Sequence, residues 1–297
     1  MPRPNQGHRY VLQLGAEAQG AQALAYLASH YAHSTPETWA ARFLAGEVEL
    51  DGHRVAADAE LRAGARLVWN RPPWVEAEVP LHFEVVHEDA ELFVVSKPSG
   101  LPCMPGGGFL EHTLLALVRA RDPELSPMHR LGRGTSGLVV FARTQEARAA
   151  LGAAFRTRDI EKRYLALASG AISPQVIRAP IGKVFHPRLG EVFAANADGR
   201  ASESHVERVE PRGDATLAEV RIVTGRPHQI RIHLAFAGHP LVGDPLYAAG
   251  GLPRAELPGL PGDLGYRLHA WRIGFAHPRT GAKLALEAPP PDWTSAR

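Results

Sequence analysis

The sequence HRLGRGTSG at residues 129–137, followed directly by the apolar run LVVFA at residues 138–142, decides how this chain is interpreted. An uninterrupted apolar run of this kind is typical of a buried strand. The preceding stretch combines a histidine, two arginines, two hydroxyl side chains and three glycines, but it contains no carboxylate. Together they predict a polar functional loop that leads into a central strand.

Length and composition set the outer limits. A chain of 297 residues, 45% hydrophobic and 22% charged, is long enough for one large globular domain and a small one. No apolar run could span a membrane, and residues 1–10 are polar and basic, so we expect neither a membrane partner nor a secretory signal. Cys103 is the only cysteine, which suggests a reducing compartment and a cytoplasmic location.

The cationic residues are mostly arginine. The formal net charge is only +2, yet the 33 cationic residues comprise 29 arginines and 4 lysines. Arginine pairs with phosphates in a bidentate way and stacks on bases, which suits a nucleic-acid partner. A GC-rich coding bias explains the same excess equally well, so composition leaves the partner open.

The pattern of elements predicts two domains. Residues 19–30 and 36–44 are expected helices, with residues 34–35 as caps, and residues 46–52 and 61–69 are expected strands. The proline-rich stretch that begins RPPW reads as a stiff linker over residues 71–80. We therefore predict a small module at 1–70 and a larger domain at 81–297.

The larger domain is predicted to be mostly β with interspersed helices. Expected strands cover residues 83–86, 92–95, 138–142, 164–168 and 217–223, and expected helices cover residues 113–121 and 145–158. The first two strands are expected to form a hairpin.

A second polar segment, TGRPHQIRIH at residues 224–233, precedes GHPLVGDPLY at residues 238–247. Pro227 fits the first position of a helix, whose free N–H groups would, with Arg226 and Arg231, face an anion. A solvated cation is the alternative for Arg226. His228, His233, His239 and Asp244 are possible metal ligands, but their spacing matches no compact motif, so we expect no metal.

Two further groups of residues have ordinary alternatives. Arg156, Arg158, Lys162 and Arg163 precede Tyr164, which suits a nucleobase with its phosphate. Taken alone, however, they are better explained as a helix C-terminus. Ser136 with His129 would suit a hydrolase nucleophile, but Thr-Ser-Gly is more typical of a turn.

Taken together and in this order, segments of residues 81–297 resemble the RluA-type RNA pseudouridine synthases. The matching segments are 91–100 (strand and Lys-Pro-x-Gly), 129–137 (catalytic loop), 162–167 (active-site tyrosine), 225–231 with 243–247 (C-terminal signature), and 268–270, 277–278 and 288–289 (closing segment). Residues 8–70 look like the small RNA-binding module typified by ribosomal protein S-four.

The resemblance implies an α+β pseudouridine synthase fold. Its parts are a mixed, mainly antiparallel sheet with surrounding helices and a central RNA-binding cleft, plus a small α/β N-terminal module. The implied reaction isomerises uridine to pseudouridine in structured RNA, either transfer or ribosomal, with the target nucleotide extruded and no metal or organic cofactor. We expect a monomer.

The resemblance also assigns roles to residues. Arg130 would lie near the extruded nucleotide, Tyr164 would pack on the uracil and help with the proton at carbon-5, Ile230 would line the pocket, and Arg231 would lie beside the catalytic carboxylate. The remaining predicted substrate- or RNA-binding positions are His129, Thr135, Ser136, Gly137, Arg226, His228 and Gln229.

The chain departs from the family pattern at its reacting position. Gly132 stands where the family has its catalytic aspartate, Gly134 at another common aspartate, and Pro227 where threonine is usual. Glycine can act neither as nucleophile nor as base, and it would leave Arg231 without its partner.

Three hypotheses follow. The first is an active synthase that uses another carboxylate, with Asp159, Glu161 and Asp244 as candidates. The second is an RNA-binding protein on the synthase scaffold that has lost catalysis, and the third is an unrelated hydrolase. A carboxylate about 3 Å from Arg231 would favour the first, and an empty space beside Gly132 with Arg231 unpaired would favour the second. We predict the enzyme.

Overall fold

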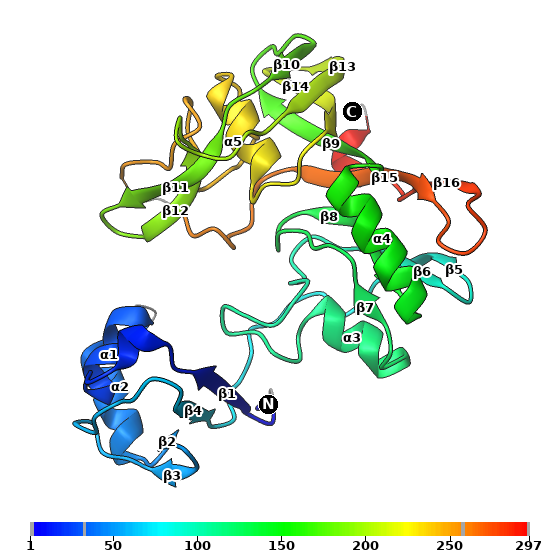
Figure 1. Cartoon of the computed structure of the whole chain (residues 1–297). Helices are drawn as coiled ribbons and strands as arrows, with labels where there is room; N and C mark the ends of the chain where they lie inside the picture. Colours follow the sequence, from blue (N-terminus) through cyan, green and yellow to red (C-terminus); the bar gives the residue numbers. More distant parts are fainter. Residues whose placement is uncertain (1–2, 32–33, 257–258, 296–297) are drawn as a thin grey trace. The chain divides into compact units, whose positions relative to one another are not determined.

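The computed structural model describes residues 3–31, 34–256 and 259–295. Residues 1–2, 32–33, 257–258 and 296–297, which fall inside the predicted domain ranges, lie outside the described residues. By its internal contacts the chain divides into two compact units, Met1–Glu76 and Ala77–Arg297. Each unit has its own sheet and its own core (Figure 1).

The first unit is a four-stranded sheet with two helices. Its elements are β1 (His8–Gln13), α1 (Ala23–His30), α2 (Pro36–Leu44), β2 (Val48–Leu50), β3 (His53–Arg54) and β4 (Arg66–Arg71), and the strand order is β1-β4-β2-β3. Thr35 caps α2 as predicted, because its hydroxyl accepts a hydrogen bond from the backbone N–H of Thr38 at 3.3 Å. The helices pack on the sheet through Trp39, Leu27 and Val48.

The second unit contains most of the chain. Its strands are β5 (Glu84–Glu88), β6 (Leu92–Lys97), β7 (Ser126–Pro127), β8 (Ser136–Ala142), β9 (Glu161–Ser169), β10 (Gln175–Ile177), β11 (Ile181–His186), β12 (Gly190–Ala195), β13 (Ser204–Arg212), β14 (Ala215–Ile222), β15 (Leu268–Ala276) and β16 (Lys283–Glu287). Its helices are α3 (Leu114–Arg121), α4 (Gln145–Thr157) and α5 (Gln229–Phe236).

One large sheet organises this unit. The strands follow the order β10-β13-β14-β9-β15-β8-β6-β5, with β16 on β15 and β7 on β8, and β11 pairs separately with β12. All these pairings are antiparallel except that of β15 with β8, which joins the two halves of the sheet (Figure 1). The predicted α+β architecture with a mixed, mainly antiparallel sheet is confirmed.

Alternation along the strands separates two faces of this sheet. On β9, Ala166 and Ala168 pack in the cluster that includes Ile230 and Leu234 of α5. Leu167 on the same strand points to the opposite face and lines a cavity there. A residue's position in the alternation therefore decides which of two separate surfaces it can serve.

Most predicted elements are confirmed, and three are corrected. The expected strand over residues 61–69 begins only at Arg66. The expected helix over residues 19–30 begins only at Ala23. Pro227 is not the first residue of a helix: α5 begins at Gln229, and His228 is its N-cap with a left-handed φ of 56°. His228 therefore interrupts the helical backbone that Pro227 was expected to start.

Gly137 is required where β8 meets β15. Its φ is +105°, and a Cβ atom there would lie 2.2 Å from the carbonyl oxygen of Ala270. We predict that Gly137→Ala destabilises the protein by about 3 kcal/mol, since strain and overlap add. Gly213 also has a positive φ, +63°, but a Cβ atom added there would have no atom within 4 Å. The control Gly213→Ala should cost only about 1 kcal/mol. Urea unfolding measures both, and equal losses would contradict the prediction.

Candidate functional site

A buried ion pair anchors the site. The Arg231 guanidinium on α5 donates from Nε to Oδ2 of Asp244 at 2.8 Å and from Nη2 to Oδ1 at 2.7 Å. The exposed fractions of the two side chains are 2% and 0%. Burial opposes ionisation of Asp244, but the hydrogen bonds and charge of Arg231 outweigh it and hold the pKa of Asp244 below its usual range.

Aromatic rings enclose the same arginine. Its guanidinium carbon lies 4.1 Å from the ring centroid of Tyr266 and 5.0 Å from that of Tyr247. Nη1 also donates to the carbonyl oxygen of Pro261 at 3.2 Å. Arg231 is thus held on several sides by the segment that leads into β15 and by the segment around Asp244.

The structure corrects the expectation that Arg231 lacks a partner. Asp244 supplies one at 2.7–2.8 Å, the distance expected for an active synthase, but its oxygens are already occupied by hydrogen bonds within the protein. Besides Arg231, its Oδ1 accepts the backbone N–H groups of Leu246 at 2.9 Å and Tyr247 at 3.1 Å. Because it is fully buried and multiply bonded, Asp244 acts as a structural anion.

The other two candidate carboxylates do not approach Gly132 either. Asp159 is exposed and accepts a hydrogen bond from the Thr157 hydroxyl. Glu161 is exposed and pairs with Arg163, and on β9 it alternates to the face opposite Tyr164. The predicted replacement carboxylate is therefore not found among these three residues.

The space beside Gly132 is filled. A Cβ atom on Gly132 would lie 2.9 Å from the hydroxyl oxygen of Tyr266, and one on Gly134 would lie 2.9 Å from the ring carbons Cε1 and Cζ of the same tyrosine. Tyr266 is 5% exposed, and its hydroxyl lies 3.2 Å from that of Thr135. This side chain takes up the volume that larger residues at 132 and 134 would need.

Tyr164 lies where the two main cores of the unit meet. It packs against the cluster of Leu131 and Val139 and also against the cluster of Ile230 and Tyr266. Burial raises the pKa of its phenol to about 12, so the phenol is neutral at neutral pH. The predicted uracil-contacting residues Tyr164 and Ile230 are thus brought together with Tyr266.

His228, the N-cap of α5, is hydrogen-bonded to Tyr247. The Tyr247 hydroxyl donates to the carbonyl of Phe193 at 2.8 Å, so it accepts from Nδ1 of His228 at 2.7 Å. Burial, together with the charges of Arg231 and Arg130, lowers the pKa of His228 to about 4. The ring is therefore neutral, with Nε2 as an acceptor, and the exposed Arg130 lies close enough for its charge to act on it.

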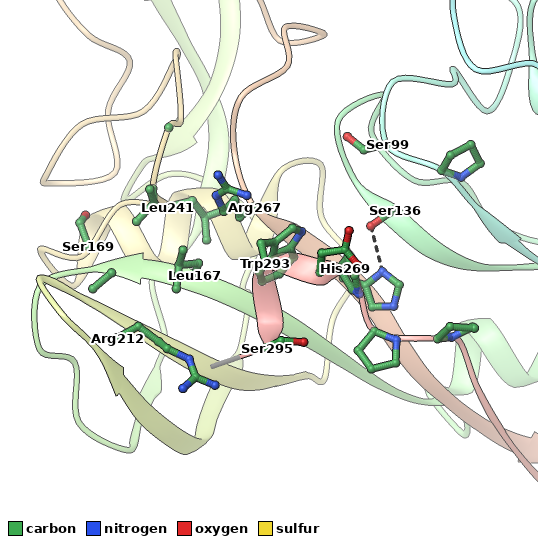
Figure 2. Close-up of a pocket in the computed structure, with 18 of the residues that line it drawn as sticks. Ser99, Ser136, Leu167, Ser169, Arg212, Leu241, Arg267, His269, Trp293 and Ser295 are labelled. Atoms are coloured by element: carbon green, nitrogen blue, oxygen red, sulfur yellow. Dashed lines mark hydrogen bonds between the residues drawn. The ribbon is translucent and has the colours of Figure 1, made fainter. Parts of the chain in front are cut away.

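Two predicted binding residues have structural partners instead. Nε2 of His129 accepts the backbone N–H of Val140 at 3.1 Å, and burial lowers the pKa of this histidine to about 4. The Ser136 hydroxyl lies 2.9 Å from Nδ1 of His269. Figure 2 shows this hydrogen bond at the wall of a cavity of about 1470 Å³, which Leu167 also lines. Ser136 pairs with His269 and not with His129, so the Ser136–His129 pair expected for a hydrolase is not formed.

The predicted anion site at the start of α5 is also not formed. The Gln229 backbone N–H donates to the carbonyl of Arg226, and its side chain bonds Thr224, the Arg226 N–H and the carbonyl of Glu203. His233 binds Ser204 and the carbonyl of Ala179. Within the described part of the chain, no three histidine, cysteine or acidic side chains group as metal ligands.

The cationic residues before Tyr164 have different surroundings. Arg163 pairs with Glu161, Glu207 and Glu219. Arg156 lies in the last turn of α4, and Arg158 is its left-handed C-cap. The helix-end alternative therefore accounts for these two arginines.

Sequence reasoning missed two residues that shape the site. Tyr266 carries no motif of its own, and only its neighbour segment 268–270 was recognised. Lys97 is fully buried, and its ammonium donates to the carbonyls of Pro98 at 2.8 Å, Leu101 at 2.7 Å and Arg133 at 3.3 Å. It ties the loop 129–137 to β6, and the Lys-Pro-x-Gly segment was the signal that could have shown this.

The Arg231–Asp244 pair should dominate local stability. We predict that Asp244→Asn costs about 3–5 kcal/mol, because it leaves a buried guanidinium without its counter-charge. Glu287→Gln in the half-exposed Arg272–Glu287 pair is the matched control, and it should cost less than about 1 kcal/mol. Chemical denaturation compares the two variants. A loss for Asp244→Asn no larger than that of the control would refute the structural role.

The acid stability of the fold should depend on His129. Its pKa is about 4 in the folded state and about 6.5 when unfolded. The unfolded state therefore binds the extra proton first, and stability falls as the pH drops from 6.5 to 4. His129→Gln keeps an acceptor for the Val140 N–H and should show a shallower loss of melting temperature over this range. The exposed His53→Gln is the control, and an unchanged slope in His129→Gln would count against the assignment.

Comparisons with known proteins agree on one family. A family model described as RNA pseudouridylate synthase matches residues 91–236. An uncharacterized RNA pseudouridine synthase of Synechocystis sp. is 41% identical over 90% of this chain and 94% of its own length. A ribosomal large subunit pseudouridine synthase D of Xanthomonas campestris is 34% identical over 91% of this chain and 84% of its own length.

A solved structure has the same fold. The human RNA pseudouridylate synthase domain containing 1 superposes with a TM-score of 0.55 at 24% identity, covering 73% of this chain and 87% of that one. In the described residues, no helix is both long and apolar enough to cross a membrane.

Proposed function

Because the chain belongs to the RluA-type family of RNA pseudouridine synthases, we propose that it isomerises uridine to pseudouridine in RNA. Ribosomal RNA is the favoured substrate, since the Xanthomonas relative is named for the large ribosomal subunit, and transfer RNA is the alternative. The small first unit would add RNA contacts. We further propose that the protein acts in the cytoplasm as a monomer.

The proposed reaction is balanced without an external reagent. The bond between C1′ of the ribose and N1 of uracil breaks, the base turns, and C1′ bonds to C5. The proton on C5 leaves, and N1 gains one. Substrate and product are isomers, so no oxidant or reductant is consumed, and we propose that no metal or organic cofactor takes part.

The observation that carries the proposal is that Tyr164 packs both on the cluster that contains Leu131 of the loop 129–137 and on the cluster that contains Ile230 of α5, the helix whose N-cap is His228. A base extruded from its stack needs an aromatic or apolar surface and a few fixed polar groups. Tyr164 and Ile230 offer the surface, and the free Nε2 of neutral His228 offers an acceptor for a base N–H. Arg130, exposed nearby, would contact a phosphate.

Tyr164 is assigned to the proton at C5. Its phenol, with a pKa of about 12, is neutral at neutral pH. It would therefore relay the proton, its hydroxyl releasing one proton to water as it takes up the proton from C5, rather than accept it as a phenolate. In this proposal Gly132 stands at the position of the family aspartate. The ion pair between Arg231 and Asp244 holds α5 in place beside the site.

A second candidate function is RNA binding without isomerisation. The observation that favours it is that none of the three candidate carboxylates lies beside Gly132, whereas the filled space there and the paired Arg231 differ from the empty site and unpaired arginine expected for this function. Such a protein would hold an extruded nucleotide without breaking its glycosidic bond.

Tritium release separates the two functions. With transcripts of ribosomal and transfer RNA that carry tritium at C5 of uridine, the wild type should release tritium to water. Tyr164→Phe should lower the rate by about 10²-fold, because it loses the proton relay, and RNA binding should be unchanged. RNA binding by the wild type without tritium release would establish the binding protein instead.

A further inference from the structure

Gly132 and Gly134 both lie in close contact with the side chain of Tyr266. The hydroxyl of Tyr266 faces Gly132, and its ring faces Gly134, each 2.9 Å from where a Cβ atom would lie. Neither glycine has a positive φ, so their backbone conformations are open to other residues. The tyrosine therefore limits the size of the side chain at both positions, whereas the backbone conformation does not.

Two further glycines allow the backbone on either side to pack closely at the start of the Tyr266 segment. Gly265, directly before it, has a φ of +119° and packs on Gly243: a Cβ atom on Gly243 would lie 2.4 Å from the carbonyl oxygen of Gly265. This approach places the start of the Tyr266 segment against the segment that contains Asp244. The position of Tyr266 is thus fixed by backbone contacts that only glycine allows.

Polar and cationic groups hold the ring and the hydroxyl. The Arg231 guanidinium lies 4.1 Å from the ring centroid, and the Thr135 hydroxyl lies 3.2 Å from the phenol oxygen. Thr135 belongs to the loop 129–137, and Arg231 is fixed by Asp244. The phenol oxygen is therefore held in one place by residues from two separate segments.

The phenol oxygen lies about as far from the Cβ position of residue 132 as a side-chain oxygen there would lie. From standard bond lengths, the carboxylate oxygens of an aspartate lie about 2.4 Å from its Cβ atom. The Tyr266 oxygen lies 2.9 Å from the Cβ position of residue 132. We propose that Tyr266 supplies the side-chain oxygen of the reacting centre that position 132 lacks, and that its hydroxyl contacts the ribose of the extruded uridine.

This inference rests on the proposed function, since it names a substrate contact in that reaction. A phenol is both donor and acceptor, and so is the ribose 2′-hydroxyl, which distinguishes RNA from DNA. Tyr266 would hydrogen-bond this group and hold the ribose while the C1′–N1 bond breaks. It forms no bond to carbon and transfers no proton.

The functional test uses a substitution that removes only the oxygen. Tyr266→Phe should lower kcat for tritium release from the labelled transcripts by at least about tenfold, with KM for RNA within twofold and an unchanged melting temperature. Tyr26→Phe, which removes a buried hydroxyl bonded to Glu17 in the first unit, is the matched control and should keep wild-type kcat. A kcat for Tyr266→Phe within twofold of the wild type would overturn the proposal.

The placement of the hydroxyl is tested separately from activity. Gly132→Ala should lower the melting temperature, and adding Tyr266→Phe should recover at least half of the loss, because this Cβ position faces only the phenol oxygen of the tyrosine. Gly134→Ala should also lower it, but Tyr266→Phe should rescue much less of that loss, since the ring carbons at 2.9 Å remain although the hydroxyl oxygen at 3.1 Å is removed. Equal rescue of both, or of neither, would show that the hydroxyl lies elsewhere and would overturn the proposal.

A third arm separates failure of the inference from failure of the proposed function. A wild type that binds RNA but releases no tritium refutes the proposed function, whatever the melting temperatures show. If the double variant Gly132→Asp/Tyr266→Ala then releases tritium, Tyr266 blocks the centre instead of serving it, and the inference fails on its own account. An active wild type with an inactive Tyr266→Phe supports both.

Discussion

The buried pair of Arg231 and Asp244 is the constraint on which the rest of the site depends. Two hydrogen bonds of 2.7–2.8 Å neutralise both charges in the interior, and the backbone N–H groups of Leu246 and Tyr247 complete the carboxylate. Removing one partner of such a pair costs far more free energy than the intact pair contributes to stability. The main effect of the pair is therefore to fix the geometry of the site. It fixes α5 against the following segment and provides the cationic surface on which Tyr266 lies.

Around that pair, the reacting centre has a different construction from the one its loop motif implies. The glycines at 132 and 134 leave no gap, because Tyr266 fills the volume beside them. Asp244 is too enclosed to act on a nucleotide, and Asp159 and Glu161 are exposed and paired elsewhere. The groups that remain for the proposed chemistry are the neutral phenol of Tyr164, the neutral imidazole of His228 and the hydroxyl of Tyr266.

The sequence predicted the architecture well because hydrophobic patterning and capping are local. The cap at Thr35 and the apolar strand that becomes β8 followed from short segments, whereas the mixed sheet was implied by the family resemblance. Partners distant in sequence could not be read in the same way. Ser136 pairs with His269, 133 positions away, and Tyr266 meets Thr135 across 131 positions. The helix start predicted at Pro227 was wrong because His228, in a left-handed conformation, is the N-cap of α5. No local sequence pattern indicates that conformation.

The central claim is that a chain with glycine at position 132 makes pseudouridine with a tyrosine in the vacated place. The most direct measurement maps pseudouridine in the ribosomal and transfer RNA of cells that lack this protein, by mass spectrometry after a chemical label that marks pseudouridine and not uridine. We expect that at least one position reverts to uridine, that the wild-type chain restores it, and that the chain with phenylalanine at position 266 does not. If every pseudouridine in both the ribosomal and the transfer RNA were retained without the protein, the claim would be contradicted.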